Sequence, residues 1–113
     1  GYGPVFKETG ERYGPFDTAL LGIGAYAPRE MMRASHATPE EAVLMGQDLK
    51  ANTLVGMHWG TVVLTQEPPF EPPERFIAAG KAAGLADDSV WVMKIGESRP
   101  LAAPDNAGWP SNA

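Results

Sequence analysis

The stretch Leu54-Val55-Gly56-Met57-His58-Trp59-Gly60-Thr61 is the one around which the rest of the sequence can be arranged. Residues with little or no polarity run directly into a histidine, a tryptophan and a glycine. A continuous apolar run of this kind is typical of a buried strand, after which the backbone turns. Functional groups collect where a rigid strand meets a loop, so His58 is a candidate for catalysis or metal binding. The alternative is a core histidine whose hydrogen bonds are satisfied.

The pattern of apolar residues, glycines and prolines predicts alternating helices and strands on both sides of this stretch. Continuous apolar runs predict strands, and apolar residues that recur at helical spacing predict helices. The expected elements are, in order, a helix over Val5–Tyr13, a strand over Phe16–Ile23, a helix that begins at Pro39 and stops by Asn52, a strand over Thr53–Met57, a helix over Glu74–Ala83 after the proline-rich loop Thr65–Pro73, and a strand over Ser89–Ile95.

The clearest local signal is the start of the helix at Thr38-Pro39-Glu40-Glu41. Threonine stands at the N-cap, proline at the first helical position and glutamate at the third. In this capping box the hydroxyl and the carboxylate each satisfy an otherwise free backbone N–H. We therefore assign Glu40 and Glu41 to helix capping and give them no catalytic role.

The order of elements predicts an α/β protein in which helices pack on a sheet, with right-handed crossovers between parallel strands. Three strands make a small sheet, and an exposed edge or face would be left over. The chain therefore looks like part of a larger sheet.

Composition excludes several classes of function. Nine Lys and Arg against fourteen Asp and Glu give a net charge of −5 without a dense basic run, so nucleic-acid binding is not expected. The chain has no cysteine, which rules out disulfides, thiolate metal ligands and a cysteine nucleophile. The longest apolar run is far short of a membrane span. Because the first residue is glycine, we expect the chain to begin after processing or inside a longer protein.

Other polar residues are weaker candidates by themselves. His36 lies two residues before the helix cap, where a solvated loop residue is the simpler interpretation. Arg29 and Arg33 could bind an anionic group, but isolated arginines near a loop are usually surface residues.

An ordered set of short motifs points to a known family. The motifs are Gly1-Tyr2-Gly3-Pro4-x-Phe6-Lys7-Glu8, Gly10-Glu11-Arg12-Tyr13-Gly14-Pro15-Phe16-Asp17, Ile23-Gly24-Ala25-Tyr26-x-Pro28-Arg29, His36-x-x-Pro39-Glu40-Glu41-Ala42, His58-Trp59-Gly60-Thr61, Glu71-Pro72-Pro73 and Gly96-Glu97-Ser98-Arg99. In this order and spacing they resemble the C-terminal part of metallo-β-lactamase-fold hydrolases close to N-acylphosphatidylethanolamine-hydrolysing phospholipase D. The resemblance implies the C-terminal half of an αββα sandwich over residues 1–99, followed by a tail over residues 100–113 that we expect to be disordered.

The resemblance also implies roles for particular residues. The family holds two zinc ions, and His58 matches the final histidine ligand in a His-Trp-Gly-Thr motif. The other ligands would fall upstream of Gly1. His36 matches a histidine that faces the active site near the substrate phosphate, which suggests positioning or proton transfer. Tyr26 and Arg29 match the loop that lines the same cleft, and are expected to bind substrate.

Two positions depart from the family pattern. Glu30 and Met31 stand where the family usually has Trp-Phe, and Gly46 stands where the mammalian enzyme has a second histidine. Both departures bear on the lipid substrate more than on the hydrolytic chemistry.

The implied function is hydrolysis of a phospholipid-like or other phosphodiester by hydroxide generated on the two zinc ions. The chain alone retains one ligand and is expected to be inactive. The alternative is a catalytically silent structural or interaction module, whose open sheet edge pairs two copies as a homodimer. We expect a cytoplasmic protein with peripheral membrane association as an option.

Overall fold

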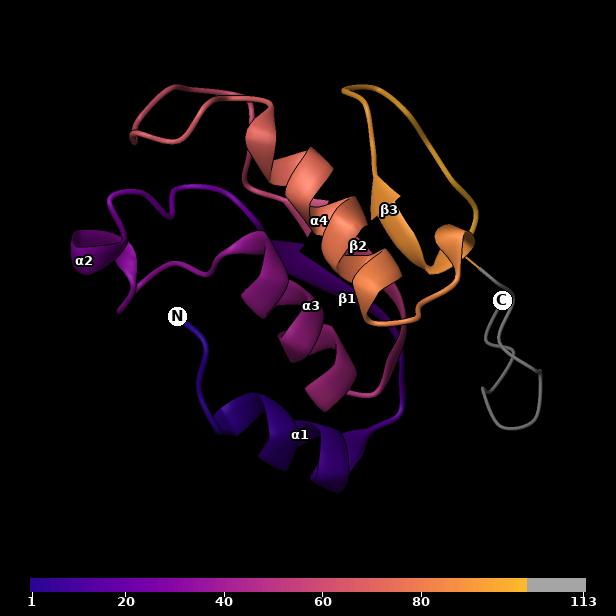
Figure 1. Cartoon of the computed structure of the whole chain (residues 1–113). Helices are drawn as coiled ribbons and strands as arrows, with labels where there is room; N and C mark the ends of the chain where they lie inside the picture. Colours follow the sequence, from indigo (N-terminus) through magenta and orange to yellow (C-terminus); the bar gives the residue numbers. More distant parts are fainter. Residues whose placement is uncertain (102–113) are drawn as a thin grey trace, which may run out of the picture.

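Three short parallel strands form the centre of the computed structural model, which describes residues 1–101 (Figure 1). Helices precede and connect them. The elements are α1 (Val5–Tyr13), β1 (Phe16–Gly22), α2 (Arg29–Met32), α3 (Pro39–Asp48), β2 (Ala51–Met57), α4 (Glu71–Ala82), the short 3₁₀ helix η1 (Asp87–Ser89) and β3 (Val90–Val92).

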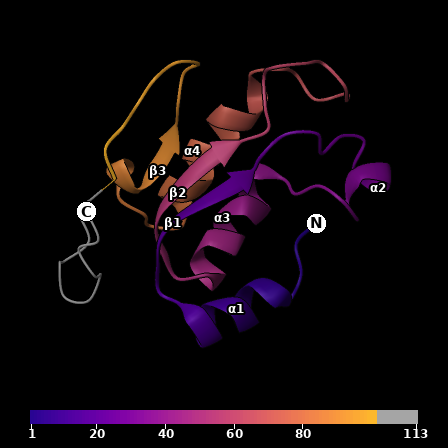
Figure 2. The ribbon, with the colours of Figure 1, turned by 180° about the vertical axis from the view of Figure 1, so that it is seen from behind.

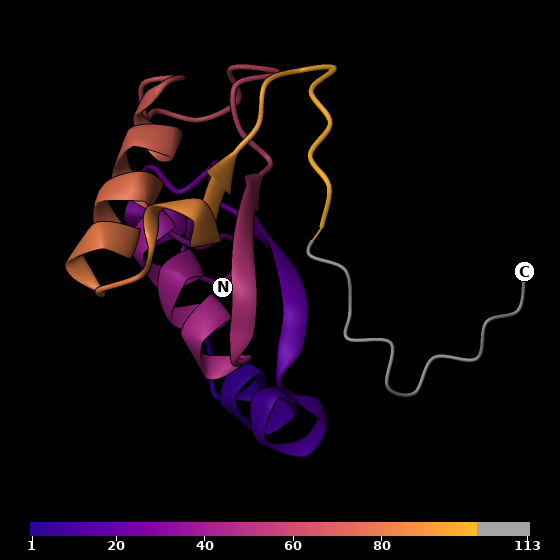
Figure 3. The same ribbon diagram turned by 90° about the vertical axis from the view of Figure 1, so that its right-hand side faces the viewer.

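The strands lie in the order β1-β2-β3, and both neighbouring pairs are parallel. Leu20 of β1 lies beside Val55 of β2, which in turn lies beside Trp91 of β3. Because crossovers between parallel strands have one preferred hand, two crossovers in the same direction put their helices on the same face. Figure 3 shows this arrangement, with α3 and α4 together on one side of the strands.

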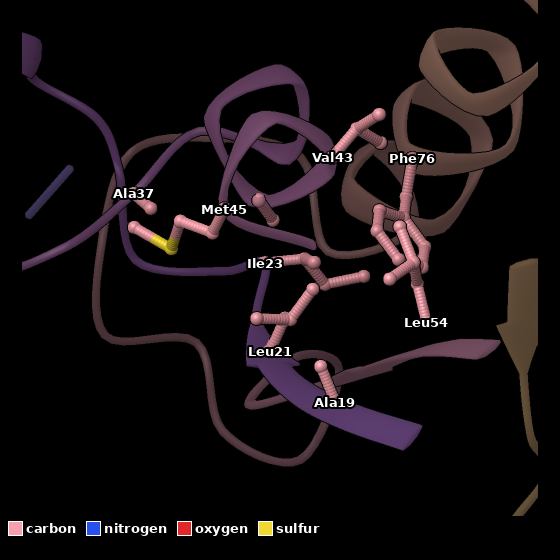
Figure 4. Packing of buried hydrophobic residues seen from close by; sticks show 9 residues of the cluster. Ala19, Leu21, Ile23, Ala37, Val43, Met45, Leu54 and Phe76 are labelled. Carbon is pink, nitrogen blue, oxygen red and sulfur yellow. The ribbon is translucent and has the colours of Figure 1, made fainter. Parts of the chain in front are cut away.

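The core lies between the sheet and these two helices (Figure 4). Ile23 and Phe76 are fully buried and Leu54 is 2% exposed. Gly56, near the end of β2, leaves room for Ile23 and Phe76, because a Cβ atom there would lie 2.8 Å from Ile23 and 3.1 Å from Phe76. A larger residue at this position would force the aromatic ring away from the sheet.

The opposite face of the sheet is uncovered over much of its area, as Figure 2 shows from that side. Side chains alternate between faces along a strand. Ala19 and Leu21 face the helices and are buried, whereas Leu20 between them is 64% exposed. Met57 at the end of β2 is 48% exposed. The expectation of a sheet with a face left over is confirmed for the described residues.

Helix α1 is attached to the end of α3 through a close backbone contact. A Cβ atom on Gly10 would lie 1.9 Å from the carbonyl oxygen of Asp48. The Tyr2 hydroxyl donates a hydrogen bond to the carboxylate of the same Asp48. Only glycine allows this approach, so the position of α1 depends on Gly10.

Two predicted elements agree closely with the structure. The first helix spans Val5–Tyr13 as expected. The capping box is also confirmed: the Thr38 hydroxyl accepts from the backbone N–H of Glu41, whose carboxylate accepts from the backbone N–H of Thr38.

Three predicted boundaries were wrong. Asn52 does not stop α3 but lies inside β2, because a tight turn with Lys50 at a φ of 56° starts the strand earlier. Helix α4 begins at Glu71, since prolines in a first turn lack only N–H groups that would be free anyway. The last strand is limited to Val90–Val92, because it pairs only with Leu54–Gly56.

The short helix α2 was not predicted. The tail that we expect to be disordered spans residues 100–113. Of these, residues 102–113 lie outside the described residues. Among residues 1–101, none of the helices has both the length and the apolar character needed to cross a membrane.

Removing the N-cap of α3 should destabilise the fold measurably. Thr38→Ala deletes the acceptor for the Glu41 N–H and should lower the free energy of unfolding by about 1 kcal/mol. Urea unfolding followed by far-UV circular dichroism measures the difference. Thr9→Ala is the matched control, because the Thr9 hydroxyl only donates back to the Val5 carbonyl within α1. Equal losses in the two variants would contradict the capping role.

Adding a methyl group at Gly10 should loosen α1. Gly10→Ala would collide with backbone atoms of α3, and such overpacking costs about 1–3 kcal/mol. This cost should exceed the gain in helix propensity, which is about 1 kcal/mol at most. Thermal unfolding checks the sign of the change. Gly3→Ala is the control because a Cβ atom there meets nothing within 4 Å. A stabilised Gly10→Ala variant would show that α1 can move aside freely.

Candidate functional site

His58 follows β2 directly and begins the turn away from the sheet. Its φ of 63° lies in the left-handed region, which a non-glycine residue adopts rarely and mostly where its surroundings impose it. The last backbone contact between the two strands precedes it, where the Ile23 N–H donates to the Met57 carbonyl over 3.0 Å. The side chain is exposed, at the carboxyl edge of the sheet, where ligands of α/β proteins commonly bind.

His36 lies next to His58, although it comes from the separate segment between α2 and α3. The two ring centroids are 5.4 Å apart, with an angle of 36° between the ring planes. The Nδ1 atom of His36 is buried and has no hydrogen-bond partner among the described residues. Both histidines of the chain therefore lie together, one directly after a strand and one in a separate loop.

Arg29 holds the His36 segment in place. Its guanidinium donates to the backbone carbonyl of His36 over 3.0 Å and also pairs with the Glu41 carboxylate. Glu41 is the same residue that completes the capping box at Thr38. Arg29 thus connects the start of α3 to the backbone of His36, and its side chain is 31% exposed.

Tyr26 lies under a charged cluster at the start of α3 and α4. Its side chain is 4% exposed, and its hydroxyl donates to the Glu71 carboxylate over 2.9 Å. Arg75 stacks over the ring at 4.6 Å, donates to Glu71 and forms two hydrogen bonds with Glu40, at 2.9 and 2.7 Å. Burial, followed by the bond to Glu71, raises the pKa of Tyr26 to about 12. Tyr26 is therefore a neutral anchor for the loop that leads to Arg29.

A pocket of about 190 Å³ opens beside His58. Its walls come from the loop after β1 and the loop after β2, with Pro72 of α4 added, and the loop residues include Gly24, Ala25, Trp59 and Glu67. The middle of the second loop is apolar and exposed; Val62, Val63 and Leu64 are 65%, 72% and 78% exposed.

Three charged residues around the site, Glu67, Glu71 and Arg75, were not identified as site residues from the sequence. Glu71 belongs to a quoted motif, and one of its partners, Tyr26, lies on another element. The i,i+4 pair of Glu71 with Arg75 is local, whereas the bonds from Ala25 to Glu67 and from Arg75 to Glu40 span 42 and 35 positions and leave no local pattern.

The donor atoms of residues 1–101 do not form a complete metal site. No group of three or more His, Cys, Asp or Glu side chains in this part of the chain is arranged to hold a metal ion. Protein zinc sites use three or four such ligands. An exposed imidazole at a strand end fits the role of one ligand, and the remaining ligands would have to come from outside the described residues.

The chain is similar to several known proteins. Residues 1–59 match the family model described as a beta-lactamase superfamily domain. N-acyl-phosphatidylethanolamine-hydrolyzing phospholipase D 1 of Caenorhabditis elegans is 39% identical over 94 residues, which are 81% of this chain and 26% of that protein. The mitochondrial N-acyl-phosphatidylethanolamine-hydrolyzing phospholipase D of Saccharomyces cerevisiae is 34% identical over 74% of this chain and 18% of its own length.

A solved structure shows the same fold. A metallo hydrolase from the hyperthermophilic archaeon Ignicoccus hospitalis superimposes with a TM-score of 0.58 and 30% identity, over 81% of this chain and 33% of its own. The chain thus spans about a quarter to a third of the first of these relatives and of this structure. The α/β fold and the family resemblance inferred from the motifs are confirmed. Because the family model matches more than half of its residues, this chain belongs to the beta-lactamase superfamily and has part of the metallo-β-lactamase fold.

Proposed function

We propose that this chain forms the C-terminal part of the active site of a zinc-dependent phosphodiesterase. The observation that carries the proposal is the contact between His36 and His58 at the carboxyl edge of the sheet. Similarity to enzymes named for hydrolysis of an N-acylated phospholipid supports a phosphodiester substrate. On this proposal the protein acts in the cytoplasm, with its phospholipid-like substrate at a membrane surface.

His58 would provide one zinc ligand in the complete protein. A ring nitrogen of neutral histidine is a common zinc ligand, and its exposed position leaves that nitrogen free to bind. Bound zinc would supply hydroxide near neutral pH and polarise a phosphoryl oxygen. The left-handed backbone at His58 aims the ring away from the sheet, toward the segment that carries His36.

His36 would hold or transfer a proton near the substrate phosphate. Its ring lies one contact away from His58, within reach of a group bound there. The hydrogen bond from Arg29 to its carbonyl fixes the backbone, which leaves the ring to rotate only about its own side-chain bonds. Tyr26 and Arg29 remain proposed substrate-site residues, and their contacts support a role in shaping the wall of the cleft.

The second candidate function is a catalytically silent structural or interaction module derived from the same fold. It is favoured by one observation, the lack of a cluster of metal-ligating side chains within residues 1–101. Such a module would bind zinc weakly, since one histidine ligand gives little affinity. Self-association through the open edge of β1 would then be its expected behaviour, and light scattering would measure it.

Replacing each histidine separately should distinguish their roles. The protein encoded by the whole reading frame is purified with zinc and assayed on bis(p-nitrophenyl) phosphate and on an N-acylated phospholipid. His58→Ala should lower the zinc content and reduce activity by at least about a hundredfold, because a metal ligand is lost. His36→Ala should keep the zinc and reduce kcat by about 10²–10⁴-fold, the contribution of general acid–base catalysis. Metal analysis and steady-state kinetics measure the two effects.

Gln47→Ala on the exposed side of α3 is the control and should change neither quantity. A wild-type protein of the whole reading frame that binds no zinc would rule out the enzyme and leave the silent module. Full zinc content in His58→Ala would remove His58 from the ligand set.

A further inference from the structure

The carboxylate of Glu67 occupies a small anion-binding site made largely of backbone. It accepts hydrogen bonds from the N–H groups of Ala25 and Ala27, over 2.6 and 3.1 Å, and from the Thr65 hydroxyl over 2.6 Å. Ala25 has a φ of 64°, and a left-handed residue of this kind turns neighbouring N–H groups toward one point. A backbone hydrogen bond from the Gln66 N–H to the Ala27 carbonyl joins the same two segments of the chain. We call this set of contacts the Glu67 junction.

This junction joins the two loops that form the walls of the pocket beside His58. Ala25 and Ala27 belong to the loop after β1, whereas Thr65 and Glu67 belong to the loop after β2. No arginine or lysine hydrogen-bonds to Glu67 among the described residues. The two loops are therefore held together by a carboxylate and neutral donors.

The loop that Glu67 holds is packed directly against His58. Gly24 precedes Ala25, and a Cβ atom on Gly24 would lie 2.2 Å from the His58 carbonyl oxygen and 3.2 Å from its carbonyl carbon. Such a close contact leaves no slack between the two backbones. A shift of Ala25 must therefore move either Gly24 or His58.

The charge of Glu67 suits this role. Burial alone would raise the pKa of its carboxyl group, but the hydrogen bonds from Thr65 and from backbone N–H groups, including those of Ala27 and Ala25, hold that pKa below its ordinary value. The group is therefore an ionised acceptor at neutral pH, and charge-assisted hydrogen bonds are stronger than neutral ones.

We propose that Glu67 is a positioning residue for His58: its carboxylate fixes the loop after β1 against the His58 backbone and so sets the direction of the imidazole. The consequence for catalysis rests on the proposed function, whereas the structural connection from Glu67 through Gly24 to His58 does not. The experiment accordingly reads the positions of backbone and ring directly, without zinc or substrate.

Removing the Glu67 carboxylate should leave the N–H groups of Ala25 and Ala27 without their acceptor and should allow His58 to change position. In Glu67→Ala of the full chain, the amide protons of Ala25 and Ala27 should move upfield in NMR spectra and exchange about ten- to a hundredfold faster, because each loses a bond to a charged group. The backbone and ring signals of His58 should shift as well. Sodium formate, which carries a single carboxylate, should enter the vacated site and restore both sets of signals in a saturable manner.

Glu74→Ala is the matched control, since Glu74 is exposed on α4 and its side chain makes no hydrogen bond to another described residue. It should leave the Ala25, Ala27 and His58 signals unchanged and should not respond to formate. Glu67→Gln is the second variant. Its amide oxygen can accept one bond, so it should keep the fold and protect one of the two amides.

Unchanged His58 signals in Glu67→Ala, with the amides of Ala25 and Ala27 released, would overturn the proposal, and so would unchanged His58 signals in Glu67→Gln with one of these amides released. Formate that restores the two alanine amides without restoring His58 would overturn it too. Because no metal or substrate is present, a protein that proved to have no zinc-dependent activity would leave this result intact. The proposed enzymatic function and the positioning role of Glu67 can therefore each be overturned without the other.

Discussion

The parallel register of β1 and β2 is the constraint on which the functional end of the molecule depends. Gly22 pairs with Met57 at the end of the ladder, and the Ile23 N–H makes the last bond across it. Both strands therefore end at the same level. Each of the two loops that follow contains a residue with left-handed backbone, Ala25 after β1 and His58 after β2. A slip of β2 by one residue against β1 would turn the buried side chains of β2 to the other face and would also move His58, so the hydrophobic core and the position of His58 are determined together.

This register separates stability from chemistry. Helices α3 and α4 cover one face and bury Ile23, Leu54 and Phe76, while the histidines lie at the carboxyl edge, outside the core. The loops at that edge are held by polar contacts to Arg29 and Glu67 in addition to the burial of Tyr26 and Ala37. Loops fixed in this way can present exposed imidazoles in defined positions, which side chains on a flexible connection could not do.

Elements with local signals were predictable, and elements defined by distant partners were not. The capping box at Thr38 and the glycine-proline stop after Tyr13 are written in adjacent residues, so α1 and the start of α3 were found correctly. The length of β3 is set by its contact with β2, which no local pattern reveals. His58 was identified from its place after a strand. The role of Glu67 depends on the left-handed backbone of Ala25, and alanine gives no sign of that conformation in a sequence.

The guanidinium of Arg75 joins three separate parts of the chain, through Glu40 at the start of α3, Glu71 at the start of α4 and the ring of Tyr26. Bonds to Glu40 and Glu71 raise the pKa of Arg75 above an already high value, while the pKa of each carboxyl group is lowered. Every charge in this junction is thus constant across the range, pH 5 to 8, in which histidine side chains generally gain or lose a proton. The frame formed by Arg75, Glu40, Glu71 and Tyr26 therefore keeps one ionic state throughout this range.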